Sequence, residues 1–179
     1  MDDAMNRIRL RPLLKSDGPA LLKANTESRD YHGAYASSLT EESKWDAWYG
    51  QLLTGPYVSL LAIDPASEGI VGLINFNEII AGPAQTAFIS YYGMVRFARR
   101  GLMTEAVGLA VRYAFEELGL HRVEAVIQLE NTRSIALVKR LGFRFEGISL
   151  RYLNVHGAWR DVERWAILAD EELCVPISG

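Results

Sequence analysis

The segment from Arg96 to Leu118 constrains the fold of this chain more than any other stretch of the sequence. It begins with six residues, R-F-A-R-R-G, that are typical of a tight basic turn ending in glycine. Apolar residues then recur at the i, i+3, i+4 and i+7 positions, which predicts an amphipathic helix with one buried face. Residues 87–95, just before the turn, are apolar and aromatic and lack a helix cap, which predicts a strand. The chain therefore passes from a strand through a basic turn into a helix.

This strand–turn–helix is suited to binding an anion such as a phosphate or pyrophosphate. Free main-chain N–H groups and the positive end of the helix dipole converge at the start of such a helix. Arg96, Arg99 and Arg100 add guanidinium groups, whose forked donors match phosphate oxygens. A surface turn with solvated arginines is the alternative interpretation, and the turn by itself leaves both open.

Composition and charge exclude several other classes. The 19 basic and 22 acidic residues give a net charge of −3, which argues against a general nucleic-acid-binding protein. The single cysteine, Cys174, rules out an intrachain disulfide, and the three histidines are not at metal-ligand spacing, so no metal is expected. We find no apolar run of the ~20 residues that a membrane helix needs and no signal peptide, so we expect a cytoplasmic protein without a membrane partner.

The remaining periodicity predicts one domain over residues 1–179 with the order β-α-α-β-β-β-α-β-α-β-β, in a monomer or homodimer. The three strands before the basic turn are joined by connections too short for a crossover, so they are expected to be antiparallel. The strand after the central helix is expected to lie parallel to the one before it. The fold class is therefore α+β: a mixed, mostly antiparallel sheet with a central β-α-β step and helices on both faces. The expected strands are 7–14, 57–63, 70–80, 85–95, 122–128, 143–152 and 159–168, and the helices besides the central one are 19–26, 40–54 and 132–141.

Several short segments, taken in their order and spacing, resemble the GNAT superfamily of acetyl-CoA-dependent N-acetyltransferases. The match is closest to the RimJ/RimL branch, which acetylates the N-terminal amine of ribosomal proteins. The resemblance implies a GNAT-like fold and acetyl-CoA as the cosubstrate. The segments are R-L-R-P-L near the start, R-R-G-L-M-T-E-A at 99–106, L-H-R at 120–122, E-N-T-R-S-I-A-L at 130–137, L-G-F-R-F-E-G at 141–147 and G-A-W-R-D at 157–161.

The resemblance assigns the coenzyme-binding residues. It makes the segment from Arg96 to Gly101 the pyrophosphate loop, with Leu102 and Met103 opening the helix. The backbone of Met94 and Val95 would pair with the pantetheine arm like an added strand, Asn131 would hydrogen-bond that arm, and Ser134 would lie near the thioester sulfur. The sequence departs from the family at Arg99, where the loop usually has its first glycine. An arginine can fit there if its φ is negative, and it adds a forked donor to the loop.

The expected reaction is direct attack of a neutral amine on the thioester. N–H groups around Met94 and Val95 are candidates for stabilising the oxyanion. Many family members carry a tyrosine that protonates the leaving thiolate, but here Val138 occupies that position. Ser134 is then the candidate acid, with a purely structural role in the first helical turn as the alternative.

Two carboxylates are candidates for a base. Glu78 lies on the strand beside the central one, although it could be a solvated strand residue. Glu105 lies in the family pattern at the helix start, where an acid also complements the dipole. An α-amine has a pKa of ~7.7–8.0, against ~10.4 for lysine. An α-amine acceptor therefore needs little assistance from a base to lose its proton.

The aromatic stretch before the second helix predicts an acceptor groove. Tyr31, His32 and Trp45 are the candidate substrate-binding residues, with Tyr35 and Trp48 beside them. The alternatives are core packing for the tryptophans and an ordinary surface position for His32. Packing is favoured over a groove role for two further aromatic residues, Tyr152 and Trp159. The expected acceptor is a protein N-terminal α-amine; a small amine (antibiotic, polyamine or amino acid) and a non-catalytic acyl-CoA-binding module are the alternatives.

Overall fold

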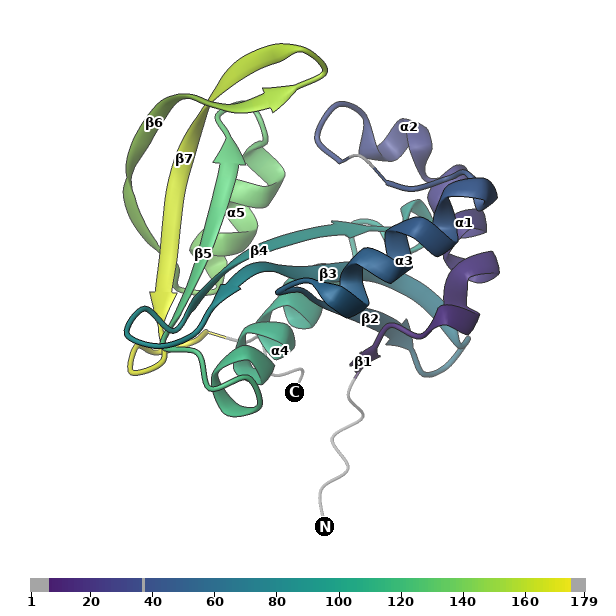
Figure 1. Ribbon diagram of the computed structural model, residues 1–179, viewed down its shortest axis with the longest axis horizontal. Helices are drawn as coiled ribbons and strands as arrows, with labels where there is room; N and C mark the ends of the chain where they lie inside the picture. The colour runs from purple at the N-terminus through teal and green to yellow at the C-terminus, as the bar shows by residue number, and fades with distance from the viewer. Residues whose placement is uncertain (1–6, 37, 175–179) are drawn as a thin grey trace.

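The computed structural model describes residues 7–36 and 38–174, and in this part of the chain seven strands form one sheet (Figure 1). The sheet order is β1-β2-β3-β4-β5-β7-β6, in which β4 and β5 are parallel and every other neighbouring pair is antiparallel. The expected mixed sheet with a central β-α-β step is therefore confirmed. The strands are β1 (Arg9–Pro12), β2 (Val58–Asp64), β3 (Gly69–Ile80), β4 (Thr86–Gly93), β5 (Arg122–Gln128), β6 (Arg144–Val155) and β7 (Ala158–Leu168).

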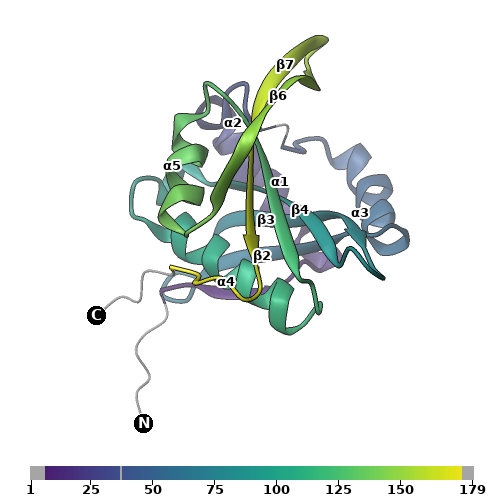
Figure 2. The ribbon, with the colours of Figure 1, turned by 90° about the vertical axis from the view of Figure 1, so that its left-hand side faces the viewer.

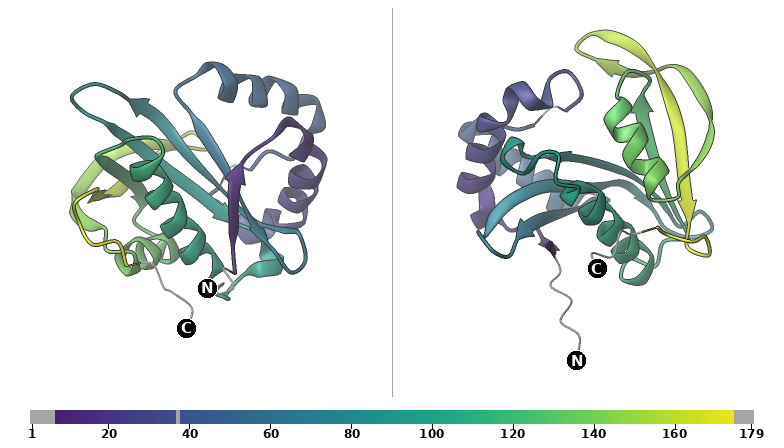
Figure 3. Two further views of the ribbon diagram at one scale, coloured as in Figure 1. Left: turned by 90° about the horizontal axis from the view of Figure 1, so that it is seen from below. Right: turned by 180° about the vertical axis from the view of Figure 1, so that it is seen from behind.

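Helices cover both faces of this sheet, as Figures 2 and 3 show. The central helix α4 (Leu102–Glu116) and α5 (Thr132–Arg140) lie on one face. On the other lie α1 (Gly18–Glu27) and α3 (Trp45–Thr54), with the short α2 (Arg29–His32) after α1. The face of α4 that the sequence pattern predicted is fully buried against the sheet, because Ala106, Val107 and Ala110 and their equivalents one turn on have no exposed surface.

The second helix begins later than the sequence predicted. Thr40 does not cap it, because the Thr40 hydroxyl accepts a hydrogen bond from Arg29 at 3.2 Å. Glu41 is extended, a single 3₁₀ turn follows at Glu42–Lys44, and α3 starts only at Trp45. Because the backbone is extended at Glu41, the residues after Thr40 are not helical and the helix forms one turn further on.

The start of α4 is fixed by contact with two paired glycines. Gly72 of β3 lies opposite Gly93 of β4, and Met103 of α4 fits into the hollow that they leave. A Cβ on Gly72 would lie 2.4 Å from the Met103 sulfur, and one on Gly93 would lie 2.7 Å from Met103 Cγ. Only glycine therefore lets the first turn of α4 approach the end of β4 this closely.

The sheet opens between its two parallel strands. β4 and β5 are paired only at Thr86–Phe88 and Arg122–Glu124. Beyond this point β4 follows β3 as far as Gly93, while β5 follows β7 as far as Gln128. The two strands therefore diverge, and the unpaired edge of β4 faces a wedge-shaped gap in the middle of the sheet.

Candidate active site

The wedge between β4 and β5 contains a cavity of about 210 Å³. Its walls are Ile89, Ser90 and Tyr91 of β4 and Ala125–Gln128 of β5, and Asn131 and Ser134 of the α5 start lie at its end. A second cavity of about 130 Å³ adjoins it on the side of α4 and α2. The cavities share four lining residues, so they adjoin each other, and we refer to the two together as the channel. These four are Tyr35, Tyr91, Asn131 and Ser134.

The basic turn after β4 leaves a row of unused donors. Thr104 and Glu105 donate their N–H groups to the Gly101 carbonyl, at 3.0 and 3.3 Å. In the described part of the chain, the N–H groups of residues 99–103 have no hydrogen-bond acceptor. Arg96 and Arg100 both stack on the buried ring of Phe97, at 5.5 and 5.7 Å. The expected anion-binding geometry, with main-chain donors at a helix start among guanidinium groups, is present.

Arg99 does not meet the condition of a negative φ under which an arginine fits the loop without strain. Arg99 has φ 62°, so it adopts the left-handed conformation in which glycine is normally found, and Gly101 follows with φ 76°. The loop therefore keeps the backbone path of a glycine-containing loop although the side chain is arginine. A left-handed residue other than glycine costs about 1 kcal/mol.

Met94 and Val95 do not offer a free edge, which corrects the role expected for them. The Met94 N–H donates to the Val71 carbonyl at 2.8 Å, and the Val95 N–H donates to the Ser28 hydroxyl at 3.0 Å. The strand ends at Gly93, and Val95–Phe97 form a 3₁₀ turn. Since alternate residues of a strand point their peptide groups to opposite sides, the N–H groups of Tyr91 and Gly93 face the wedge instead.

Asn131 and Ser134 lie together at the wedge, as expected. Asn131 caps α5, because its Oδ1 accepts the Ser134 N–H at 3.3 Å. The Ser134 carbonyl accepts a hydrogen bond from the Tyr91 hydroxyl at 3.4 Å. In the described residues the Ser134 hydroxyl itself makes no hydrogen bond, so it can serve a ligand in the channel. Val138 is fully buried in the core.

Tyr91 is a channel residue that the sequence reasoning missed. Burial raises the pKa of its phenol far above the ordinary value of 10, so the hydroxyl stays protonated at any physiological pH. Burial also raises the pKa of its neighbour Tyr92 to about 12. The signal available in the sequence was the pair of tyrosines directly before the basic turn, where a strand that faces a ligand has to end.

Neither of the two expected carboxylate bases reaches the channel. Glu78 is exposed on a bulge of β3, with φ 51°, at the end of the sheet where β4 and β5 are still paired. It lines neither of the two cavities. Glu105 is only 5% exposed and forms an ion pair with Arg7 at 2.9 Å. The structure thus separates both acids from the residues around Ser134.

The residues around α2 form the mouth of the channel. Tyr31, His32 and Tyr35 line it, as expected. His32 is buried rather than on the surface: its Nε2 donates to the Gly93 carbonyl at 2.9 Å, and its Nδ1 lies 3.0 Å from the Ser38 hydroxyl. Tyr35 crosses the mouth, because its hydroxyl donates to the Glu130 carbonyl at 3.3 Å.

Trp45 is not an acceptor residue, which corrects another expectation. It is buried against Gly18 of α1, its Nε1 donates to the Lys15 carbonyl at 3.2 Å, and it stacks on Tyr49. Core packing, the alternative for the tryptophans, is what the structure shows.

The aromatic residues of the β6–β7 hairpin are more exposed than expected. Trp159 is 61% exposed, so the expectation that it packs is wrong. Tyr152 packs partly, beneath the Arg164 guanidinium, which lies 5.1 Å from its ring centre.

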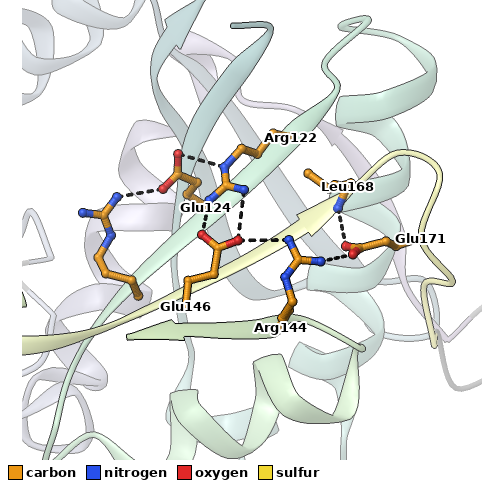
Figure 4. Close-up of polar contacts among 7 residues, drawn as sticks. Arg122, Glu124, Arg144, Glu146, Leu168 and Glu171 are labelled. Carbon is orange, nitrogen blue, oxygen red and sulfur yellow. Dashed lines mark hydrogen bonds and ion pairs between the residues drawn. The ribbon is translucent and has the colours of Figure 1, made fainter. Parts of the chain in front are cut away.

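An ion-pair network holds the paired end of the wedge (Figure 4). Glu124 of β5 binds Arg122 at 3.1 Å and Arg164 of β7 at 2.7 Å, and Arg122 also binds Glu146 of β6. Arg144 continues the chain by binding both Glu146 and Glu171. Although burial acts to raise the pKa of Glu124, hydrogen bonds from the two arginines hold it below its usual value. Glu124 is therefore a structural anion and not a base.

Comparison with known proteins identifies the family. Residues 7–144 match the model of the acetyltransferase (GNAT) domain. The chain belongs to the GNAT acetyltransferase family. The chain is therefore an acyltransferase of the N-acetyltransferase type.

The relatives differ in the acceptors that their names give. The chain is 32% identical to a probable N-acetyltransferase, YjcK, of Bacillus subtilis over 92% of this chain and 96% of that one. It is 36% identical to the Escherichia coli ribosomal protein uS5-alanine N-acetyltransferase over 55% and 50% of the two chains, and 27% identical to the Escherichia coli spermidine N(1)-acetyltransferase over 62% and 57%. Mycobacterium smegmatis RimJ in complex with CoA-disulfide superposes with a TM-score of 0.80 at 25% identity, over 91% and 82% of the chains.

Two searches of the described residues gave negative results. No helix there combines the length and the apolar character that a bilayer crossing requires. No group of three or more His, Cys, Asp or Glu side chains among those residues is arranged to hold a metal ion.

Proposed function

We propose that this protein transfers the acetyl group of acetyl-CoA to the N-terminal α-amine of a protein. The observation that carries the choice of acceptor is the lining of the channel: among the described residues neither cavity is lined by a carboxylate, and Arg133 is the one charged side chain. A polycationic acceptor such as a polyamine needs acidic groups to replace its lost hydration. A peptide end, with one amine and a chain of amides, suits a neutral, aromatic groove.

Successive parts of acetyl-CoA are suited to successive groups of residues along the site. The N–H groups of residues 99–103, together with Arg96, Arg99 and Arg100, are suited to the diphosphate. The open edge at Tyr91 and Gly93 is suited to the amide-containing arm. Asn131 Nδ2 and the Ser134 hydroxyl are then placed to hydrogen-bond the end of that arm. Bound there, acetyl-CoA would supply an acetyl group already activated as a thioester.

The rest of the catalysis is positioning and exclusion of water. The main-chain N–H groups that face the wedge would stabilise negative charge on the carbonyl oxygen, which is a large term in acyl transfer. The Ser134 hydroxyl would donate to the leaving sulfur. No carboxylate base is needed, because an α-amine has a pKa of ~7.7–8.0 and a substantial fraction of it is neutral at physiological pH.

The spermidine relative supports a second candidate, a polyamine acceptor. One experiment separates the two. The purified protein is incubated with acetyl-CoA and equal concentrations of three acceptors: a lysine-free peptide with a free N-terminus, an N-blocked peptide with one lysine, and spermidine. Mass spectrometry and release of free thiol report transfer.

We expect acetylation of the free N-terminus alone, increasing with pH up to about 8 as the α-amine deprotonates. Ser134→Ala provides the control for enzyme-dependent transfer, and it should lower kcat while leaving acetyl-CoA binding close to that of the wild type. Faster transfer to spermidine than to any of a panel of free N-termini would contradict the proposal.

A further inference from the structure

A buried acid lies where an anion is expected to bind. Glu105 is in the first turn of α4, directly behind the free N–H groups of residues 99–103, and its side chain is only 6% exposed. An unpaired carboxylate in that position would repel a diphosphate and cancel the favourable end of the helix dipole. The acid therefore needs a counter-charge if the helix start is to bind the coenzyme.

Arg7 supplies that counter-charge from a distant part of the sequence. Its Nε donates to Glu105 Oε2 at 3.0 Å, and its Nη2 lies 2.9 Å from the same oxygen, across a separation of 98 residues. In the described residues Glu105 has no other ion-pair partner. The Arg7 side chain is 43% exposed and the Glu105 side chain 6%, so the pair is partly buried. Removal of Arg7 leaves the charge of the buried Glu105 uncompensated, which is unfavourable.

Arg7 also holds the main chain of the loop. Its Nη1 donates to the Arg100 carbonyl at 3.4 Å, and its Nη2 would lie 3.9 Å from a Cβ on Gly101. The peptide group between Arg100 and Gly101 is planar and trans, so its N–H points away from its carbonyl. With the carbonyl held by Arg7, the Gly101 N–H is directed to the opposite side of the loop.

We propose that Arg7 is a positioning residue for the coenzyme: it neutralises Glu105 and fixes the 100–101 peptide group, so that the start of α4 presents positive donors to the diphosphate. This rests on the acetyl-CoA site proposed above. Arg7 acts through Glu105 and the loop, and the coenzyme need not touch it.

The charge argument predicts effects of opposite sign for the two partners. Arg7→Met leaves the buried carboxylate unpaired and should weaken CoA binding about tenfold. Glu105→Gln removes the negative charge and should tighten CoA binding about two- to threefold at low salt. The double variant should recover most of the affinity that Arg7→Met loses. Arg7→Lys keeps the charge but not the forked geometry, so its loss should be smaller.

The experiment measures CoA affinity by calorimetry at low and physiological salt, the melting temperature of each ligand-free variant, and KM for acetyl-CoA apart from kcat. Arg9→Met is the matched control, because Arg9 also forms an ion pair with a glutamate, Glu68, but both side chains are at least half exposed. We expect the KM for acetyl-CoA to rise in Arg7→Met and kcat to change little.

Three results would overturn the inference. The first is equal CoA affinity in Arg7→Met and Arg9→Met. The second is an equal loss of affinity in Arg7→Met and Glu105→Gln that follows the melting temperature, which would make the pair merely structural. The third is a wild-type protein that binds no CoA, which would remove the proposed function as well, whereas the first two leave it intact.

Discussion

The two ends of the contact between β4 and β5 are built in opposite ways. At the paired end, strand hydrogen bonds and a network of arginine and glutamate side chains join β5 to its neighbours. At the open end the strands diverge, and the N–H groups of Tyr91, Gly93 and residues 99–103 are left for a ligand. The comparison teaches that side chains fix β5 against β7 and β6 beside the paired end, where the β4–β5 ladder closes the sheet. At the other end no strand of the described residues closes the sheet, and backbone donors are left unpaired.

The largest expected effect comes from filling the hollow at Gly72 and Gly93, which lies beneath the open end of the β4–β5 contact. In Gly72→Ala the new Cβ would lie 2.4 Å from the Met103 sulfur and 2.6 Å from the Tyr92 carbonyl oxygen. Because a carbonyl of the sheet cannot move aside, we expect a loss of about 2–3 kcal/mol in the free energy of unfolding, together with weaker CoA binding. Urea denaturation and calorimetry measure the two effects.

The control for this substitution is Gly50→Ala. No atom lies within 4 Å of a Cβ at that position, in the middle of α3. There alanine should stabilise the protein by about 0.5–1 kcal/mol through helix propensity. Equal stability of Gly72→Ala and the wild type would show that the contact of Met103 with Gly72 and Gly93 does not fix the start of α4.

A smaller effect is expected at the paired end. Arg122→Met removes a partner of both Glu124 and Glu146, whose side chains are 14% and 28% exposed. We expect a loss of about 1–2 kcal/mol, between the values for surface and buried pairs. Urea denaturation at neutral pH measures it.

Acid unfolding provides a second test of the Arg122–Glu146 ion pair. The hydrogen bond from Arg122 lowers the pKa of Glu146 from 4.5 to about 2. A lowered folded-state pKa contributes stability that is present above the unfolded value of 4.5 and is lost as the pH falls toward 2. The wild type should therefore lose stability steadily between about pH 5 and pH 2, and Arg122→Met should lose less over the same range. Parallel curves for the two proteins would contradict the role given to this ion pair.

The smallest effect is expected at Arg99. Arg99→Gly relieves a left-handed residue and should gain up to about 1 kcal/mol of stability, reduced by the greater chain entropy of glycine in the unfolded state. It also removes a guanidinium group from the loop, so CoA binding should weaken a few-fold and become less sensitive to salt. Arg99→Ala separates the two effects, because it removes the charge and keeps the strain. Lower stability in Arg99→Gly than in Arg99→Ala would contradict the strain at this residue.

Part of the main chain of the site could be predicted from the sequence. The helix period, the glycine-ended basic turn and the asparagine before α5 are local signals, and the structure confirms the helix, the turn before it and the Asn131 cap. The strand edge for the coenzyme arm followed from family resemblance and was placed at Met94 and Val95 rather than at Tyr91 and Gly93, because strand divergence depends on partners distant in the sequence.

The side-chain parts were much harder to predict. Glu78 and Trp45 were placed on plausible elements, but a bulge turns the first away from the channel and a contact with Gly18 buries the second. Tyr91 was missed because its role depends on where β4 leaves β5, and the pair of tyrosines before the basic turn gives only an indirect signal of that point. Arg7 could not be recognised either, since its partner is 98 residues away.

The contact of Met103 with the two paired glycines has a consequence for the salt concentration and pH at which the start of α4 keeps its structure. Contact between Met103, Gly72 and Gly93 is uncharged, so ionic strength and acidity act on it only weakly. The ion pairs of Arg7 and Arg122, by contrast, respond to both. High salt should therefore reduce the affinity of the loop for phosphate groups long before it displaces the helix that carries them.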